Sequence, residues 1–405
     1  MNKKKKLSLA VQIFIGLFLG ILAGFVFLAA GKAEWAVAYV KPFGTIFLNL
    51  IKFIVVPIVL CSIIGGVISM KDLRKVGSIG WKTVVYYLIT TAFAVVIGLF
   101  FANIFKGAFQ VLQTSNLEYE VAQNTNFMDT LVNIFPSNII QPMSDAIMLQ
   151  VIVIALFFGF GIILAGEKGE PLAAVIISLN DVSMIIMELI LKLSPIGVFC
   201  LITPVVAENG AKILGSLAMV LLTAYICYAV HALLVYSLSV KSFAGLSPAK
   251  FFKGMAPAMA MAFSSASSVG TLPLNMECAE KLGAKKDIAS FVLPLGATIN
   301  MDGTAIYQGV CAVFIATCFG IDLTLAEMMT IVLTATLASI GTAGVPGSGM
   351  IMLAMVLQSV GLPVEGIALV AGVDRIFDMG RTVVNITGDA SCAIVVSALE
   401  SKKNK

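Results

Sequence analysis

The sequence predicts an all-α integral membrane protein with eight transmembrane helices and two re-entrant helical hairpins. Hydrophobic residues make up 59% of the 405 residues, charged residues only 12%, and the mean hydropathy is +1.02. Soluble domains carry about 25% charged residues. Apolar stretches of about 20 residues, the length that crosses about 30 Å of hydrocarbon, recur along the whole chain.

The apolar segments define the expected spans. They run over 9–30, 43–70, 83–105, 144–165, 173–206, 213–239, 286–320 and 364–398. The first span follows lysines at 3–6 but is too long for a signal peptide and lacks a small-residue cleavage site, so we expect it to be retained. Segments 247–282 and 324–360 are interrupted by small and helix-breaking residues, which is typical of re-entrant hairpins.

Basic residues indicate the orientation in the membrane. With the amino terminus inside, eighteen lysines and arginines fall on the cytoplasmic side and four fall outside. The positive-inside rule and an even number of spans therefore predict a multi-pass protein of the cell membrane with both termini cytoplasmic. The polar stretch 109–138 is expected to be an extracellular loop.

The last 160 residues repeat a pattern. Ser268–Thr271 is echoed by Ser339–Thr342, and each copy precedes an apolar helix with a polar cluster, at 300–304 and 385–389. Paired, interrupted apolar segments are the best sequence indication of a transporter's binding site. We therefore expect both helices to open at these glycine-containing clusters and both repeats to form one site.

Charged residues within these spans indicate the chemistry of that site, because each costs at least about 2.5 kcal/mol at mid-bilayer. The candidates are Asp302, Asp374, Arg375, Asp378, Arg381 and Asp389. At about 100° per residue, one polar stripe of the last helix is expected to contain Asp374, Asp378, Arg381, Thr382, Asn385 and Asp389, with Arg375 at its edge. The Arg381 fork suits a carboxylate, and Asp378 suits an amino group, which predicts an acidic amino acid. A purely structural Arg381–Asp378 pair is the alternative.

Cations are expected beside this substrate. Four aspartates against two arginines leave the site near minus two, and an acidic amino acid adds another negative charge. Such a cluster is prohibitive in a low dielectric without cations. Sodium needs hard oxygen donors, which Asn300, Asp302, Asn385 and Asp389 supply.

Other features indicate less. Small residues at the hairpin tips, Ser267 and Ser268 in the first and 343–349 in the second, leave backbone N–H groups accessible to a substrate carboxylate. His231, the only histidine, lies in an apolar segment with no acidic cluster beside it, which predicts a satisfied or lipid-boundary side chain. The sequence contains no catalytic motif, so the rivals to a transporter are a channel or a structural membrane protein, and an enzyme is not expected.

At these residues the sequence resembles the glutamate transporter homologue family, the dicarboxylate/amino acid:cation symporters. The matching motifs lie at 86–91, 263–273, 294–304, 341–346 and 374–389. The resemblance implies inverted repeats, a homotrimer, and an elevator-like movement of a transport domain against a scaffold. It implies symport of L-aspartate, L-glutamate or both with sodium, with about three ions near the bilayer midplane. Proton-coupled, C4-dicarboxylate and neutral amino acid carriers of the same fold are the alternatives.

The resemblance also divides the chain. Residues 1–70 are scaffold helices 1 and 2, and 71–140 are the third helix, part of the transport domain, with the extracellular loop. Residues 141–240 are scaffold helices 4 and 5 and the transport-domain helix 6. Residues 241–400 are the transport core, with hairpin 1, helix 7, hairpin 2 and helix 8.

Residue by residue, the resemblance assigns Arg381 to the substrate's side-chain carboxylate and Asp378 to its amino group. Further substrate contacts, from the resemblance and from the hairpin tips, are expected at Thr304, Thr382, Asn385, Ser267, Ser268, Val345 and Gly349. One sodium site matches Gly296, Asn300, Asn385 and Asp389; a second matches Thr298, Ser339, Ile340 and Thr342; a third matches Tyr87, Thr90, Thr91, Asn300 and Asp302.

Two positions depart from the family pattern. Archaeal relatives carry an arginine in the first hairpin where this chain has Ala266, while Arg375 stands in the last helix and can restore the local charge. Position 379 is methionine, whereas animal glutamate carriers have arginine there, which argues against potassium counter-transport.

Overall fold

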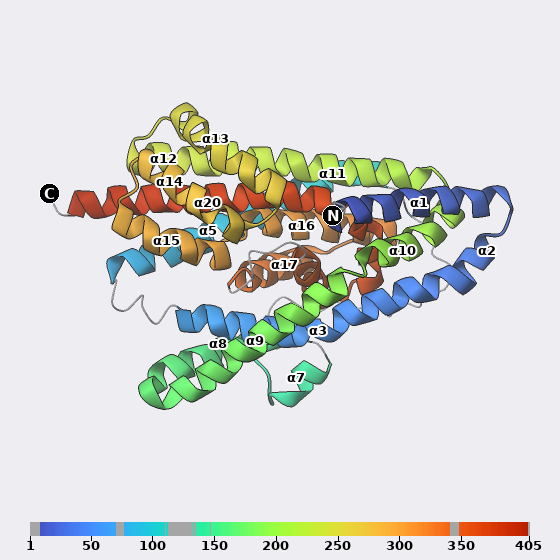
Figure 1. Ribbon diagram of the computed structural model, residues 1–405, viewed down its shortest axis with the longest axis horizontal. Coiled ribbons are helices and arrows are strands. Elements are labelled where there is room, and N and C mark those ends of the chain that lie inside the picture. The colour runs from blue at the N-terminus through green and yellow to red at the C-terminus, as the bar shows by residue number, and fades with distance from the viewer. Residues whose placement is uncertain are drawn as a thin grey trace, which may run out of the picture.

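The computed structural model describes residues 9–69, 77–109, 111, 132, 135–145, 147–340 and 348–403. All regular elements in these ranges are helical (Figure 1). The first half contains α1 (Leu9–Ala29), α2 (Ala33–Trp35), α3 (Lys41–Ser69), α5 (Ser78–Phe105), α7 (Ile140–Ser144), α8 (Met148–Ala165), α9 (Glu170–Leu191) and α10 (Ser194–Asn209). The second half contains α11 (Lys212–His231), α12 (Ser237–Ala244), α13 (Pro248–Ser265), α14 (Ser268–Lys281), α15 (Lys286–Ile299), α16 (Asp302–Cys318), α17 (Leu325–Ala338), α18 (Ser348–Ser359), α19 (Ile367–Ala371) and α20 (Asp374–Lys403).

One group of helices is built around α3 and α10. α8, α9 and α10 pack on α3, and α1 packs on α10. A stripe of glycines on α1, at positions 16, 20 and 24, allows this last contact, because a Cβ at any of the three would overlap α10. Small residues at such spacing let helices approach closely within a membrane, where packing rather than hydrophobic burial drives association. Figure 1 shows α3, α8 and α9 diverging from the long helix α20.

A second group is built around α16 and α20. α5 and α11 pack on α16, while α12, α13, α14 and α15 pack on α20. α5 approaches α16 at Gly98, where a Cβ would lie 2.8 Å from the Ile306 carbonyl oxygen. α16 is almost wholly buried and α20 is mostly buried, whereas only a small part of α1 is. These two helices therefore lie in the interior of the second group.

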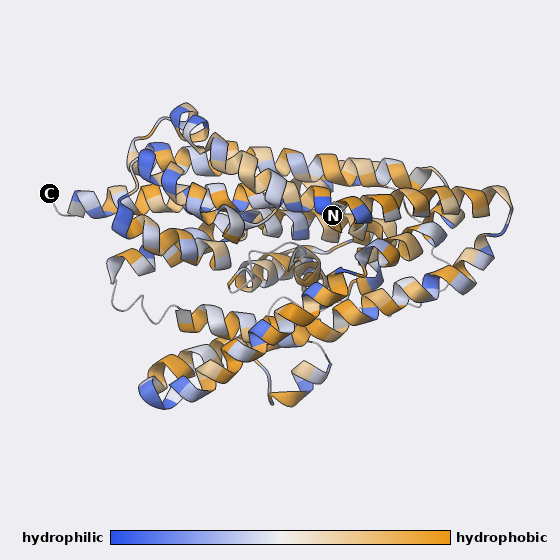
Figure 2. Ribbon diagram, in the orientation of Figure 1, coloured by the Kyte–Doolittle hydropathy of each residue, from blue (hydrophilic) through white to orange (hydrophobic). Residues whose placement is uncertain are grey.

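Seven helical stretches in the described part of the chain are long and apolar enough to cross a membrane, and Figure 2 shows hydrophobic residues along most of their length. One of them, Gln150–Leu191, spans 42 residues, which as one straight helix would measure about 63 Å, twice the hydrocarbon thickness. A 3₁₀ turn at Gly166–Gly169 divides it into α8 and α9. The structure is thus a multi-pass membrane protein, and the number eight stays a prediction.

Several predicted boundaries need correction. The span expected over 173–206 is two helices, α9 and α10, that meet at residues 192–193. Pro195 stands in the first turn of α10, where its missing N–H has no helical partner to lose. The segments 247–282 and 324–360 are each a pair of helices, α13–α14 (hairpin 1) and α17–α18 (hairpin 2), and their re-entrant placement in the membrane stays a prediction.

The two polar clusters behave differently. The predicted opening at 300–304 is confirmed, since Asn300 and Met301 leave the helical conformation between α15 and α16. The opening predicted at 385–389 is wrong, because α20 runs unbroken from Asp374 to Lys403. Gly388 serves close packing instead: a Cβ there would lie 2.6 Å from Asn300 Nδ2 and from the Tyr236 hydroxyl.

Candidate functional site

The polar stripe of α20 lies inside the protein. Its members are at most 5% exposed: Asp374, Asp378, Arg381, Thr382, Asn385 and Asp389. α15, α16 and hairpin 1 pack around the helix that carries them. Because buried charges and amides need partners, the contacts of this stripe define the candidate site.

The Arg381 guanidinium is held by carboxylates. Its Nη1 and Nη2 donate to the two oxygens of Asp374 at 3.1 and 3.2 Å, and its Nε donates to Asp378 Oδ1 at 2.8 Å. The guanidinium carbon lies 4.7 Å from the centre of the Tyr307 ring, which adds a cation–π contact. The planar fork therefore already engages one carboxylate in bidentate geometry.

Glycines make room for this arginine. A Cβ at Gly349, at the start of α18, would overlap Arg381 Nη1, and a Cβ at Gly303 would overlap the Arg381 backbone. Gly349 was predicted as a substrate contact, and the structure places it directly against the guanidinium. Hairpin 2 and α16 therefore both approach α20 at the arginine.

Two predicted substrate residues follow the arginine on α20, Thr382 and Asn385, and a third, Thr304, lies on α16. Asn385 Oδ1 accepts a hydrogen bond from the Gly303 backbone at 2.8 Å, and its Nδ2 lies 3.5 Å from the Thr304 hydroxyl. The Thr382 hydroxyl donates to the Asp378 carbonyl at 2.7 Å. The predicted substrate residues of α16 and α20 are therefore brought together.

Arg375 of α20 contacts the tip of hairpin 1. Its Nη2 donates to the Ser265 carbonyl at the end of α13 at 3.2 Å, and its Nη1 lies 3.6 Å from Asp378 Oδ2. Ala266 adopts a left-handed conformation with φ of 50° at the tip. Ser267 caps α14 by accepting from the Gly270 backbone at 3.0 Å, and the adjacent Ser268 is buried. Arg375 thus ties the hairpin 1 tip to α20.

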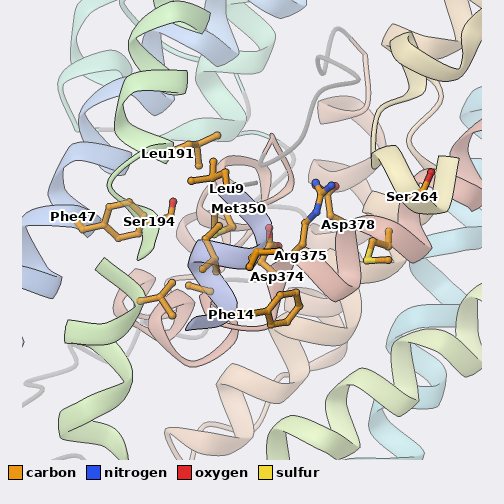
Figure 3. Close-up of a pocket in the computed structure, with 15 residues that line it drawn as sticks. Leu9, Phe14, Phe47, Leu191, Ser194, Ser264, Met350, Asp374, Arg375 and Asp378 are labelled. Atoms are coloured by element: carbon orange, nitrogen blue, oxygen red, sulfur yellow. The ribbon is translucent and has the colours of Figure 1, made fainter. Parts of the chain in front are cut away.

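A cavity of about 520 Å³ lies beside the carboxylates. Figure 3 shows Phe47, Leu191 and Ser194 on one side, and Arg375, Asp378 and Ser264 on the other. The first set belongs to the α3–α10 group and the second to the α16–α20 group. A ligand in this cavity would meet Asp374 and Asp378, the two carboxylates that hold Arg381.

Asp302, at the start of α16, is the centre of an oxygen-rich cluster. Its Oδ1 accepts from the Thr91 hydroxyl at 2.7 Å and from the Thr90 hydroxyl at 3.3 Å, both on α5. Asn300 Oδ1 is buried and has no partner in the described part of the chain. Tyr87 is buried nearby and donates to the Val292 carbonyl. The five residues predicted for the third sodium site are buried on two neighbouring segments: Tyr87, Thr90 and Thr91 on α5, and Asn300 and Asp302 at the break between α15 and α16. Their role as sodium ligands stays a prediction.

A second oxygen cluster forms around Asp389. Asn300 Nδ2 donates to Asp389 Oδ1 at 2.9 Å and to the Asn385 carbonyl at 3.0 Å. A Cβ at Gly296 would overlap Asp389 Oδ1, so only glycine allows this approach. The residues predicted for the first sodium site are therefore neighbours, and Asn300 joins the two clusters.

The remaining predicted sodium site is not assembled by the described contacts. The Thr298 hydroxyl donates to Leu295, and the Ser339 hydroxyl donates to Thr336, each within its own helix. The Ile340 backbone donates to Leu337. Thr342, like the substrate residue Val345, lies outside the described residues, so both assignments stay predictions.

The donor types suit an alkali cation. Carboxylate, amide, hydroxyl and carbonyl oxygens surround both clusters, and hard cations prefer such oxygens. Among the described residues, no three His, Cys, Asp or Glu side chains gather as a metal site. The buried, unpaired oxygen of Asn300 is the observation that favours a cation here, because a buried acceptor needs a partner.

Comparison with known proteins identifies the family. Residues 9–399 match the sodium:dicarboxylate symporter family. The chain belongs to this family. It is 38% identical over 410 residues to the proton/sodium-glutamate symport protein of Bacillus caldotenax, covering 99% of this chain and 96% of the relative.

Two further relatives of the sodium:dicarboxylate symporter family are informative. The proton/glutamate-aspartate symporter of Escherichia coli (strain K12) is 36% identical over 414 residues, covering 99% of this chain and 94% of the relative. The C4-dicarboxylate transport protein of Bacillus subtilis (strain 168) is 32% identical over 405 residues, covering 98% of this chain and 94% of the relative. The chain is therefore a membrane transporter of small molecules and not an enzyme.

The structure of this family member also brings residues to the site that the sequence analysis did not assign to it. His231 was expected to be satisfied or at a lipid boundary; it is 0% exposed and lies 3.3 Å from Asp302 Oδ2. Tyr236 donates to the same oxygen, and Tyr307 lies under Arg381. For His231 the sequence offered one signal, a lone histidine in a spanning segment. Tyr236 and Tyr307 had no comparable signal in the sequence.

Proposed function

We propose that this chain is a sodium-coupled symporter of acidic amino acids, L-aspartate, L-glutamate or both. The substrate site lies between Arg381 and Asp378 of α20, with Thr304, Thr382 and Asn385 beside it. The cation sites lie at the break between α15 and α16. The substrate's charge and the cations are bound together because neither is stable there alone.

The Arg381–Asp374 pair is the main support for a substrate that contains a carboxylate. The arginine is 2% exposed and forms two parallel hydrogen bonds to one carboxylate, next to a cavity of about 520 Å³. A substrate carboxylate can take the place of Asp374 on the same fork without new geometry. A buried guanidinium retains such specificity because its donors are fixed in a plane.

Charge balance supports cation coupling. Among the described residues, the buried polar cluster holds four aspartates, at 302, 374, 378 and 389, against the two arginines Arg375 and Arg381, which gives a formal charge of minus two. An acidic amino acid brings the total to minus three. Burying such an excess is prohibitive unless cations neutralise it. Each bound cation therefore raises the affinity for substrate, and substrate raises the affinity for cations by the same factor.

Asp378 favours an amino acid over a C4-dicarboxylate. Asp378 lines the cavity, with its Oδ2 3.6 Å from Arg375 and its Oδ1 bound to Arg381. A carboxylate in this position attracts an ammonium group and repels a second carboxylate. The C4-dicarboxylate relative and the proton coupling in the names of two other relatives keep a dicarboxylate carrier and a proton-coupled carrier as the second candidates.

The two helix groups support an elevator mechanism. The α16–α20 group contains the described site residues of α5, α15, α16, hairpin 1 and α20, and the α3–α10 group contributes the far wall of the cavity. α18, which brings Gly349 to Arg381, contacts both groups. We propose that the first group is the transport domain, that the second is the scaffold, and that movement between them exposes the site alternately. A homotrimer assembled through the scaffold is part of this proposal.

Ligand binding to the purified protein tests the function. Affinities for L-aspartate, L-glutamate, succinate and L-alanine are measured by calorimetry in sodium buffer and in choline buffer at two pH values. The proposal expects tight binding of the acidic amino acids in sodium only. Succinate binding that exceeds aspartate binding would favour the C4-dicarboxylate carrier, and sodium-independent, pH-dependent binding would favour proton coupling.

A further inference from the structure

A π-helical turn interrupts the helix that follows Lys212. α11 ends at His231, the turn covers Ala232–Tyr236, and α12 begins at Ser237. In an α-helix, residues five apart lie about 140° apart around the axis, at about 100° per residue. A π turn closes i→i+5 hydrogen bonds, so residues five apart lie nearly above each other. The turn therefore places His231 and Tyr236 on one face.

That face meets Asp302. His231 Nε2 lies 3.3 Å from Asp302 Oδ2, and the Tyr236 hydroxyl donates to the same oxygen at 2.7 Å. The two rings also contact each other edge to face, with centres 4.9 Å apart and planes at 89°. All three side chains are 0% exposed. Both groups therefore converge on one oxygen of one carboxylate.

The two oxygens of Asp302 have separate partners. Oδ2 is bound from the π turn, whereas Oδ1 faces the Thr90 and Thr91 hydroxyls of α5. Threonine hydroxyls can accept as well as donate, so they can turn their oxygens toward a cation. The unpaired Asn300 Oδ1 is the other buried acceptor of this predicted site. Fixing Oδ2 thus leaves Oδ1 as the oxygen presented to the cation.

The contact with Asp302 uses one of the two ring nitrogens of His231. Nε2 must carry a hydrogen in order to donate to a carboxylate. Nδ1 is buried and has no partner in the described part of the chain. Because an unpaired buried nitrogen is unfavourable, the imidazole is retained here for its bond to Asp302.

We infer that the π turn Ala232–Tyr236 is a positioning device for the cation site, in which His231 and Tyr236 hold Asp302 Oδ2 so that Oδ1 binds the cation. This inference rests on the proposed function, because it needs a sodium ion at Asp302. Partners of this kind orient metal ligands, and losing one typically weakens metal affinity about 10- to 100-fold. The device acts on sodium affinity and leaves the substrate contacts at Arg381 unchanged.

The test measures the sodium concentration that half-saturates L-aspartate binding. His231→Leu and Tyr236→Phe are expected to raise it about 10- to 100-fold, with aspartate affinity at saturating sodium within about twofold of wild type. His231→Gln keeps an N–H donor and is expected to restore most of the sodium affinity. Tyr228→Phe is the matched control: it removes another buried hydroxyl of α11, one with no partner among the described residues.

Deleting Leu233 tests the turn itself. This side chain is 61% exposed, and its removal converts the π turn into an α-helical one while keeping the flanking helices. The deletion is expected to weaken sodium affinity as His231→Leu does, with thermal melting reporting that the variant is folded.

The outcomes separate the two proposals. Wild-type protein that binds aspartate without sodium removes the proposed sodium coupling. Wild-type protein that requires sodium, with His231→Leu and Tyr236→Phe shifting its sodium dependence no more than Tyr228→Phe, overturns the positioning role alone. Equal loss of aspartate affinity at all sodium concentrations would also overturn it, because that pattern reports general disruption.

Discussion

Replacing Arg381 with alanine removes the group that defines the substrate. The structure gives this guanidinium two parallel hydrogen bonds to one carboxylate, at 3.1 and 3.2 Å. A substrate carboxylate bound in the place of Asp374 would lose both hydrogen bonds in the Arg381→Ala variant. Hydrogen bonds to charged groups contribute about 1.5–3 kcal/mol each, so the loss is about 3–6 kcal/mol. At 1.4 kcal/mol per tenfold change, L-aspartate affinity is expected to fall by about two to four orders of magnitude.

The assay is calorimetric titration of L-aspartate at saturating sodium. Arg381→Ala leaves the buried Asp374 without its arginine and leaves Asp378 only its longer contact with Arg375. The double variant Arg381→Ala/Asp374→Asn reduces that charge excess and shows whether affinity is lost because the substrate contact is lost. Arg381→Lys keeps the charge without the fork and is expected to lose an intermediate amount. Arg375→Ala, on the same helix and 18% exposed, is the matched control with a smaller effect. Unchanged aspartate affinity in Arg381→Ala would contradict the assignment of Arg381 to the substrate carboxylate.

Three further variants test separate contacts. Asp378→Asn is expected to lower the affinity for aspartate relative to succinate about 10- to 100-fold, from the loss of about 1.5–3 kcal/mol at the amino group; a competition assay checks this, and an unchanged ratio contradicts it. Thr91→Val removes a hydroxyl 2.7 Å from Asp302 Oδ1 and is expected to raise the half-saturating sodium concentration about fivefold or more. Its control, Thr83→Val, removes a hydroxyl bonded within α5 and is expected to leave the half-saturating sodium concentration unchanged. Gly349→Ala forces a methyl group against Arg381 and is expected to weaken aspartate binding at a cost of about 1–3 kcal/mol; wild-type affinity there would place hairpin 2 away from the arginine.

Much of this fold follows from local composition. Apolar length predicted the spans, and small or helix-breaking residues predicted both hairpins and the opening at Asn300. The boundary between α9 and α10 was missed because both flanks are apolar and were read as one span, although Pro195 marks the start of a helix there. The opening expected at Gly388 was wrong because a helical glycine also serves close packing, and the partner here, Tyr236, comes from a distant segment.

The site was predictable where charge made it visible. Arg381, Asp378 and Asp302 stood out because a charged group in an apolar span is costly without a partner. The partners themselves were less visible. Asp374 was expected on the polar stripe, but its bidentate bond to Arg381 depends on two turns of helix and on side-chain direction. His231 and Tyr236 became related only through a π turn, which hydrophobic periodicity does not reveal.

In the proposed mechanism, the Arg381 guanidinium and Asp378 bind an acidic amino acid, and sodium balances its excess negative charge. Uptake of radiolabelled L-aspartate into liposomes containing the purified protein measures this coupling. Uptake above equilibrium is expected with an inward sodium gradient, and none with choline in place of sodium at any imposed pH gradient. Concentrative uptake of equal rate in choline would contradict the account.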